Sequence, residues 1–222
     1  MNPDGIAVYY ESLEHLCFGR ALERRRYAFL REAQVSKYAL ICGGGDGRFL
    51  ARLLAVNPGV EVDFVDCSVR MTLLAQQRIA GMGRAAMRRV HFFIGDIREF
   101  KPRFNGYDLI ATNFFFDCLT EQEAGHLIEL VTAWMLPCAT WMISEFQTAG
   151  GRRFDRFWKS AIVRSLYLGF RITTGLKVSK IPNYALPLLM AGFERCREES
   201  ALYGLLLSSV WRHKLNDHSR PA

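Results

Sequence analysis

The sequence predicts an α/β protein built on a mostly parallel, doubly wound sheet of seven strands. Short apolar runs alternate with helical segments, which is typical of a parallel sheet covered by helices on both faces. A glycine-rich string directly follows the first of these runs and precedes a helical segment. The chain then ends in two consecutive strand-like runs with no helix between them, so we expect the sheet to finish in an antiparallel hairpin.

The individual elements follow from periodicity and from the residues that end each run. Apolar residues at helical spacing predict helices within residues 5–33, divided near Gly19. Thr120 and Glu123 form a capping box that opens another helix. The predicted strands are 38–42, 60–65, 90–94, 107–112, 140–145, 194–199 and 202–211. The predicted helices after the first segment are 48–56, 69–82, 120–135, 152–170 and 183–191.

Composition excludes several classes of protein. Hydrophobic residues make up 50% of the 222 residues, which excludes a disordered chain. No apolar run approaches the ~18 residues of a spanning helix, and the first twenty residues contain no secretory apolar core. The six cysteines never stand at C-x-x-C spacing, so we expect neither a metal site nor a disulfide framework. These features predict a cytoplasmic protein, with a membrane-peripheral location left open.

The basic charge is concentrated in one segment. The chain carries 29 Lys and Arg against 22 Asp and Glu, but residues 1–147 hold 16 and 17 of them. Residues 152–180 contain eight basic residues and a single acid, Asp155. Because the excess is local and no recognition module accompanies it, nucleic acid ranks last among partners. A cap helix with solvated charges and an interfacial helix that meets an anionic membrane both remain open.

A glycine loop carries the strongest functional signal. Gly43, Gly44, Gly45 and Gly47 lie between the first predicted strand and the following helix, where backbone can approach a ligand closely. Asp66 ends the next strand, 23 residues after Gly43, where it can accept hydrogen bonds from a ribose diol. The dinucleotide fingerprint G-x-G-x-x-G/A is not met, because an arginine stands at its sixth position.

Two further strand ends carry polar residues. Asp96 follows the third strand and suits the exocyclic amine of adenine, and Asn113 follows the fourth strand. In an open α/β sheet, ligands bind outside the carboxyl ends of the strands. We therefore expect these residues to converge with the glycine loop on one crevice.

These motifs make residues ~36–212 resemble a class I S-adenosylmethionine-dependent methyltransferase, a family with a Rossmann-like sheet of the extent expected for one doubly wound domain. The resemblance lies in the strings ALICGGGDGRFL, VDFVDCS, FFIGDIREF and YDLIATNFFFDCL. One position departs from the family, because Ile41 stands where an acidic residue often lies. Tyr10 or backbone then remain as alternatives to contact the methionine amino group. The resemblance implies S-adenosylmethionine as cofactor, bound by Gly43, Gly44, Gly45, Gly47, Asp66, Cys67, Ser68, Met71, Asp96, Ile97, Asn113 and Phe114.

The resemblance also implies a single domain over residues 1–222. In this interpretation N-terminal helices occupy 1–35, the cofactor-binding core 36–146, a helical cap 147–182, and the last helix and hairpin 183–212. The implied reaction is methyl transfer to a small apolar or amphiphilic acceptor, such as a phenolic, quinone-like or lipid compound. Peripheral membrane contact through residues 152–180 is a further expectation, and the oligomeric state stays open.

A general base is needed only when the acceptor reacts through a protonated O–H or N–H group. Asp117 is the leading candidate for this catalytic role. Phe114–Phe116 can face the sulfonium through cation–π contact or can belong to the core. The other candidate bases are Glu145, His91, His126 and Tyr184.

Two alternatives of other kinds remain. The string GGGDG is also frequent in spermidine synthases, which transfer an aminopropyl group on the same fold. Those enzymes need an acidic element after the fourth strand, whereas residues 113–117 are apolar between their ends. The second alternative is a non-catalytic scaffold that keeps a nucleoside cofactor.

Overall fold

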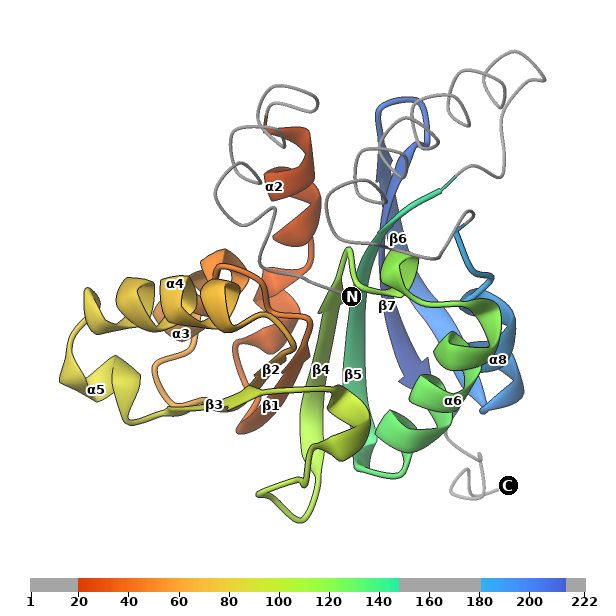
Figure 1. Cartoon of the computed structure of the whole chain (residues 1–222). Helices are drawn as coiled ribbons and strands as arrows, with labels where there is room; N and C mark the ends of the chain where they lie inside the picture. The colour runs from red at the N-terminus through yellow and green to blue at the C-terminus, as the bar shows by residue number, and fades with distance from the viewer. Residues whose placement is uncertain (1–19, 148–180, 215–222) are drawn as a thin grey trace, which may run out of the picture.

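A computed structural model describes residues 20–147 and 181–214 of the chain, and its centre is one seven-stranded sheet (Figure 1). The strand order is β3-β2-β1-β4-β5-β7-β6. Strands β1 to β5 pair in parallel, and β7 runs antiparallel to both β5 and β6. The predicted fold class is therefore confirmed. The strands are β1 Tyr38–Cys42, β2 Glu61–Asp66, β3 Val90–Ile94, β4 Tyr107–Asn113, β5 Met135–Phe146, β6 Phe193–Ala201 and β7 Leu206–His213.

Helices cover both faces of the sheet. In Figure 1, α3, α4 and α5 cover one face of the sheet, whereas α6 and α8 cover the opposite face. Short 3-10 turns follow β3 and β4, at the ends where ligands bind in such sheets. The helices are α2 Ala21–Arg26, α3 Arg48–Val56, α4 Val69–Ala80, α5 Arg84–Met87, α6 Glu121–Thr132 and α8 Ala185–Met190; the 3-10 turns are η2 Leu30–Ala33, η3 Ile97–Glu99 and η4 Phe116–Cys118.

Two hydrophobic cores hold the sheet between these layers. The first core packs α3 and α4 against the sheet and includes Leu53 and Phe64, both fully buried. The second packs α6 and α8 against the opposite face and includes Ile128, Trp141 and Phe193, which are also fully buried. Each fully buried side chain of this size contributes roughly 1.5–3 kcal/mol of hydrophobic free energy. The two cores therefore fix the strand ends that carry the candidate site.

Several element boundaries differ from the sequence prediction, most clearly at the end of α6, at the start of β5, which begins at Met135 rather than 140, and at the start of the last strand. The predicted capping box is present, but α6 ends at Thr132 rather than near 135. The backbone N–H of Tyr107 donates to the carbonyl of Trp134 at 2.9 Å, which draws the chain into the parallel pairing of β4 and β5. The last strand begins at Leu206 rather than 202, because the preceding residues form a turn. Three of these turn residues have positive φ: Leu202, Tyr203 and Gly204.

Several predictions lie outside the described residues. These are the helix at 152–170, residues 148–180 of the predicted cap and the contact through Tyr10. The predicted membrane contact through 152–180 also lies outside them. Within the described ranges 20–147 and 181–214, no helix has the length and apolar character needed to cross a membrane.

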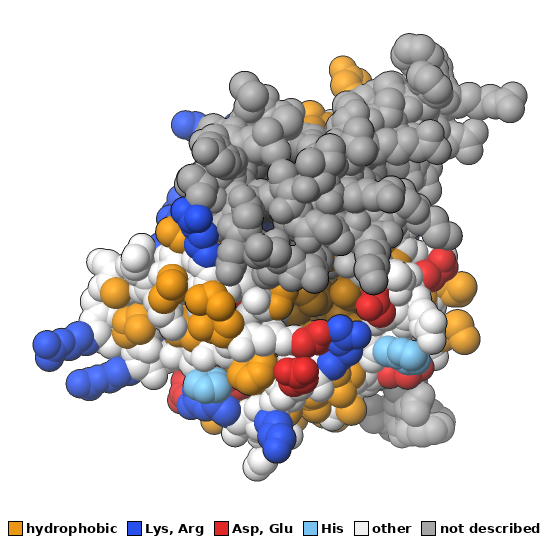
Figure 2. Space-filling view, viewed as in Figure 1, with side chains coloured by type: hydrophobic (Ala, Val, Ile, Leu, Met, Phe, Trp, Pro, Cys, Tyr) orange, Lys and Arg blue, Asp and Glu red, His pale blue; other side chains and the backbone are white. Residues whose placement is uncertain are grey.

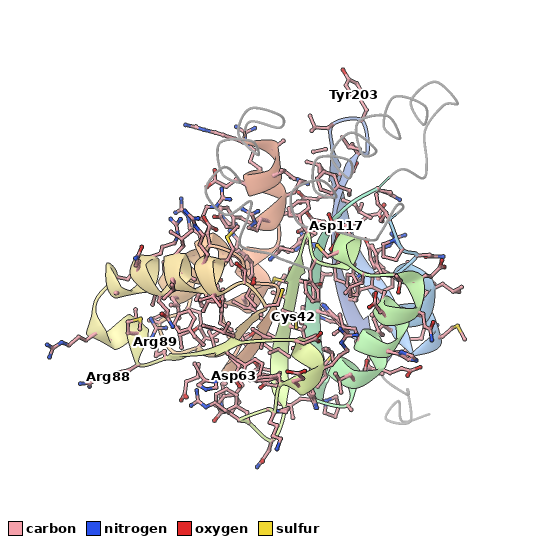
Figure 3. All side chains as sticks on the ribbon, in the orientation of Figure 1. Cys42, Asp63, Arg88, Arg89, Asp117 and Tyr203 are labelled. Atoms are coloured by element: carbon pink, nitrogen blue, oxygen red, sulfur yellow. The ribbon has the colours of Figure 1, made fainter. Side chains whose placement is uncertain are left out.

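A buried polar cluster lies within the sheet, on the side away from the carboxyl ends of the parallel strands. Asp63 of β2 is fully buried, and Tyr107 donates its hydroxyl to Asp63 Oδ2 at 2.6 Å. His91 Nδ1 and Arg103 Nη1 lie 3.2 and 3.5 Å from Asp63 Oδ1. Figure 3 shows Asp63 well separated from Asp117. This cluster joins β2, β3 and β4 and is a structural element of the frame.

We expect Tyr107→Phe to lower the free energy of unfolding by about 1–3 kcal/mol, because it leaves an oxygen of a buried carboxylate without its shortest hydrogen bond. Urea unfolding at pH 7 measures the change. The matched control is Tyr203→Phe, since Tyr203 is 84% exposed and should change stability by less than about 0.5 kcal/mol. Equal effects of the two substitutions would contradict a stabilising role for the cluster.

Candidate functional site

The glycine loop after β1 bends sharply at the carboxyl edge of the sheet. Gly43, Gly45 and Gly47 have φ of 66, 59 and 78°, values that side chains other than glycine rarely adopt. A Cβ at Gly44 would lie 2.0 Å from the Phe64 ring, so the loop presses directly on β2. A Cβ at Gly45 would meet nothing within 4 Å, so the loop is open at this residue.

Asp66 at the end of β2 is tied to both sides of this loop. Its Oδ2 accepts a hydrogen bond from the backbone N–H of Gly45 at 2.7 Å, and its Oδ1 accepts from Ser68 N–H at 2.8 Å. These bonds fix the carboxylate beside the open part of the glycine loop. Each carboxylate oxygen can accept more than one hydrogen bond, so this acid keeps the chemistry that ribose hydroxyls require.

The beginning of α4 extends the site. Cys67 is exposed, whereas Ser68 is buried and its hydroxyl accepts from Met71 N–H at 3.1 Å as the N-cap of α4. Met71 is half-buried in the first turn of this helix. Figure 2 shows hydrophobic side chains gathered over α4, where Val69 and Leu73 are about half exposed. Ser68 therefore shapes the helix start, while its neighbours provide apolar surface beside Asp66.

Asp96 follows β3 and is held by its own turn. Its Oδ1 accepts from the backbone N–H of Arg98 at 2.9 Å, and the guanidinium of Arg98 also binds its carboxylate. The side-chain hydrogen bond from Arg98 is the main reason that the pKa of Asp96 is lowered. Ile97 is buried in the core below. Asp96 is thus a fixed anion at the third strand end, where the sequence predicts it.

The loop after β4 brings aromatic side chains to the same edge. Asn113 ends β4 and pairs with Ser144 of β5. Phe114 has a φ of 54°, and its ring lies 5.2 Å from that of Phe146. The Phe115 ring packs on Gly43 so closely that a Cβ there would lie 2.2 Å from it. No local pattern in the sequence indicates that Phe115 is a neighbour of the glycine loop, and only this packed geometry reveals it.

Glu145 anchors that loop from β5. It is fully buried, and its Oε1 accepts the backbone N–H groups of Phe115 and Phe116 at 2.7 and 2.8 Å. Burial, together with the negative charge of Asp117, raises the pKa of Glu145 well above its usual range. Glu145 at the end of β5 therefore fixes the conformation of the loop that follows β4.

Asp117 lies in η4 and is 8% exposed (Figure 3). Burial raises its pKa to about 6, and a hydrogen bond from Cys118 Sγ to Asp117 Oδ1, 3.4 Å long, opposes this shift. A carboxylate with such a pKa is matched to proton transfer near neutral pH. The role of Asp117 as a general base stays a prediction, and its raised pKa is compatible with it.

The other candidate bases lie in different parts of the fold. Tyr184 is buried and its ring stacks on that of Phe116 at 5.1 Å, so it belongs to this region. Burial raises the pKa of Tyr184 above its usual range. His91 belongs to the Asp63 cluster, and His126 is exposed on α6. Among the described residues, no group of three metal-ligating side chains gathers at one place.

The residues at this edge fit an adenosyl cofactor. Open space at Gly45, three positive φ angles and the oriented carboxylate of Asp66 together provide a backbone cradle and ribose acceptors. Asp46 cannot take part in the same way, because Arg48 and Arg78 bind its carboxylate. Ile41 is buried in β1, so no carboxylate replaces the family's acidic residue at that position.

Comparison with known proteins agrees with this fit. Residues 40–134 match the family described as "Methyltransferase domain". The chain is 29% identical over 154 residues to N-terminal Xaa-Pro-Lys N-methyltransferase 1 of Bos taurus, a match that covers 68% of this chain and 67% of that protein. The same enzyme of Ailuropoda melanoleuca is 27% identical over 154 residues, with the same coverage.

Solved structures share the fold. The mitomycin 7-O-methyltransferase MmcR aligns with a TM-score of 0.69 at 16% identity, over 92% of this chain and 57% of that one. Human N-acetylserotonin methyltransferase, in complex with SAM, aligns with a TM-score of 0.61 at 16% identity, over 93% and 55%. The chain thus spans less than two thirds of the length of these solved proteins.

The antiparallel β7 beside β5, the glycine loop and the Asp66 acceptor define an S-adenosylmethionine-binding fold rather than a dehydrogenase sheet. Residues 40–134 match a methyltransferase domain, and the chain shares its fold with methyltransferases of known structure. It is therefore similar to the class I S-adenosylmethionine-dependent methyltransferases, with S-adenosylmethionine as the cofactor. The resemblance stated from the sequence is confirmed.

We expect Asp66→Asn to weaken S-adenosylmethionine binding about 10- to 100-fold, because a charged acceptor hydrogen bond contributes about 1.5–3 kcal/mol. Calorimetry measures the affinity. Asp108→Asn is the matched control, since Asp108 also accepts two backbone N–H groups, those of Lys37 and Tyr38. Unchanged affinity in Asp66→Asn, or equal losses in both variants, would show that Asp66 does not hold the ribose.

We expect the buried Asp117 to make the fold less stable as pH rises. Its folded-state pKa of about 6 lies above the ordinary value of 3.8, so its contribution is full below about pH 4 and is lost as pH rises through 6. Urea unfolding between pH 4 and 8 should show a decline on the order of 1–3 kcal/mol. Asp117→Asn should flatten the decline and Asp108→Asn should keep it; parallel curves for Asp117→Asn and the unsubstituted protein would contradict the assignment.

Proposed function

We propose that this protein transfers the methyl group of S-adenosylmethionine to a small apolar or amphiphilic acceptor at the carboxyl ends of β4 and β5. The observation that carries the proposal is the contact between the Phe115 ring and Gly43. This contact joins the cofactor loop directly to the loop that follows β4. A ligand on the glycine loop and a second ligand beside residues 114–117 would then be neighbours.

The bound cofactor supplies a methyl group already activated by its sulfonium, so the protein mainly positions the reactants and excludes water. Asp66 and the glycine loop hold the nucleoside in this proposal. Asp117 takes the proton of the acceptor, since its carboxylate is buried beside Phe116 and ionises near neutral pH. Aromatic rings make the surroundings apolar: Phe114, Phe115, Phe116, Phe146 and Tyr184.

The relatives support two kinds of reacting atom. MmcR is named as an O-methyltransferase, which favours a hydroxyl group such as that of a phenol. The curated relatives are named as N-methyltransferases of Xaa-Pro-Lys N-termini, which favours an amine. All these relatives are methyltransferases by name, so aminopropyl transfer is not favoured. Peripheral membrane contact through 152–180 remains a prediction.

The test is incubation of the purified protein with radiolabelled S-adenosylmethionine and fractions of a cell extract. We expect label in a low-molecular-weight, lipid-soluble product, and we expect Asp66→Asn to lose most of it while Asp108→Asn keeps it. Label in protein N-termini would contradict a small acceptor and would favour N-methylation of protein N-termini instead. Cofactor binding with no transfer to any fraction would favour the scaffold, and transfer only from decarboxylated S-adenosylmethionine to putrescine would favour aminopropyl transfer.

A further inference from the structure

Glu145 has one carboxylate oxygen that the fold uses and one that it does not. Oε1 accepts the two backbone N–H groups of Phe115 and Phe116. Oε2 is equally buried and has no hydrogen-bond partner within the described part of the chain. A buried polar atom without a partner is destabilising, and more so when the group is charged. Such an atom calls for an explanation, and a donor that arrives with a ligand at this strand end is one.

Asp117 brings a second buried carboxylate to the same place. It follows β4, whereas Glu145 lies on β5. Burial raises the pKa of Glu145, and the nearby charge of Asp117 raises it further. Tyr184 also lies within the electrostatic reach of Glu145. Two like charges in a dry site repel each other, and a cation or a shared proton relieves that repulsion. The pair therefore favours a ligand that carries positive charge and several N–H donors.

The surroundings make this preference selective. Phe116 is fully buried, Tyr184 is 8% exposed, and their rings are nearly parallel at an interplanar angle of 11°. Trp141 also packs against Phe116, and their ring centroids are 6.2 Å apart. An alcohol or phenol offers a single O–H and no charge, so it can satisfy Oε2 but cannot offset the charge of the pair. An ammonium group can do both.

We propose that Glu145 and Asp117 form the subsite for an amine nitrogen of the acceptor, in which an N–H group donates to Glu145 Oε2. This inference rests on the proposed function and names the reacting atom of that same site. The ammonium loses one proton to a carboxylate oxygen of the pair, so R–NH3+ and –COO− become R–NH2 and –COOH. The N–H electron pair stays on nitrogen as a lone pair. With the cofactor bound, this lone pair would form the N–C bond to the methyl group as the S–C bond breaks, and the S–C electron pair would leave on the sulfur of S-adenosylhomocysteine.

Burial drives this proton transfer in the required direction. An ion pair in a low-dielectric site is less favourable than the two neutral groups formed from it, because both charges have lost their hydration. In water an alkyl ammonium would keep its proton at neutral pH. Glu145 and Asp117 thus serve first to bind the cation and then to accept its proton.

The test measures binding of matched probes to the protein saturated with S-adenosylhomocysteine. Calorimetry compares phenethylamine with 2-phenylethanol, methylamine with methanol, and a tripeptide bearing a free N-terminus with its N-acetylated form. We expect the amine of at least one pair to bind at least 10-fold more tightly than its neutral counterpart. If no amine binds in preference to its counterpart, the inference is wrong.

Variants separate a binding role from a structural one. Glu145→Gln keeps an oxygen for the amides of Phe115 and Phe116. It should lower the ratio of the affinity for the amine to that for its neutral counterpart at least 10-fold. Glu61→Gln is the matched control, since Glu61 is exposed at the start of β2 and should keep the preference. If Glu145→Gln fails to give a cooperative thermal transition, Asp117→Asn makes the same comparison. An amine preference that survives in the folded variant would overturn the inference.

Binding of S-adenosylhomocysteine, measured first, separates this inference from the proposed function. If the unsubstituted protein does not bind it, the proposed function fails at the cofactor. If it binds the nucleoside but shows no amine preference, the amine subsite alone is wrong and methyl transfer to oxygen is favoured.

Discussion

The hydrogen bonds accepted by Glu145 Oε1 are the constraint on which the candidate site depends. They hold the backbone of Phe115 and Phe116, and so set the path of the chain directly after β4. Phe114 just before them adopts a positive φ of 54°, which costs about 1 kcal/mol or more and persists only where neighbouring contacts enforce it. One buried carboxylate thus maintains a loop that local preferences would not produce.

That loop in turn connects two parts of the site. Phe115 lies against Gly43, where only hydrogen leaves room for its ring, and Phe116 stacks on Tyr184 toward α8. A shift of the loop would therefore alter the cofactor cradle and the aromatic wall together. This geometry explains why a glycine is required at 43 for packing as well as for backbone conformation.

Local patterns predicted the frame, but not the contacts between strand ends. Strand β1 and helix α3 begin and end as predicted, because a short apolar run and the glycine loop define them within a few residues. The position of Asp66 follows from the same local logic. Glu145 could be identified only as a candidate base, because its bonds depend on the register that places Asn113 opposite Ser144. The end of α6 is set by the long-range pairing of β4 and β5, so the local pattern predicted a helix that is too long.

Glu145 and Asp117 are two carboxylates buried at one edge of the sheet, an unfavourable arrangement that the stability of the fold does not require. Asp63 shows how this protein satisfies a buried acid when the role is structural, since a tyrosine donates to one oxygen and histidine and arginine side chains contact the other. Within the residues that the structure describes, Glu145 accepts hydrogen bonds on one oxygen only, beside a second acid whose pKa is raised. Natural proteins retain such conflicts chiefly where function requires them. The contrast between these two buried acids, in one sheet, is the strongest physical argument that the β4–β5 edge is built for a ligand.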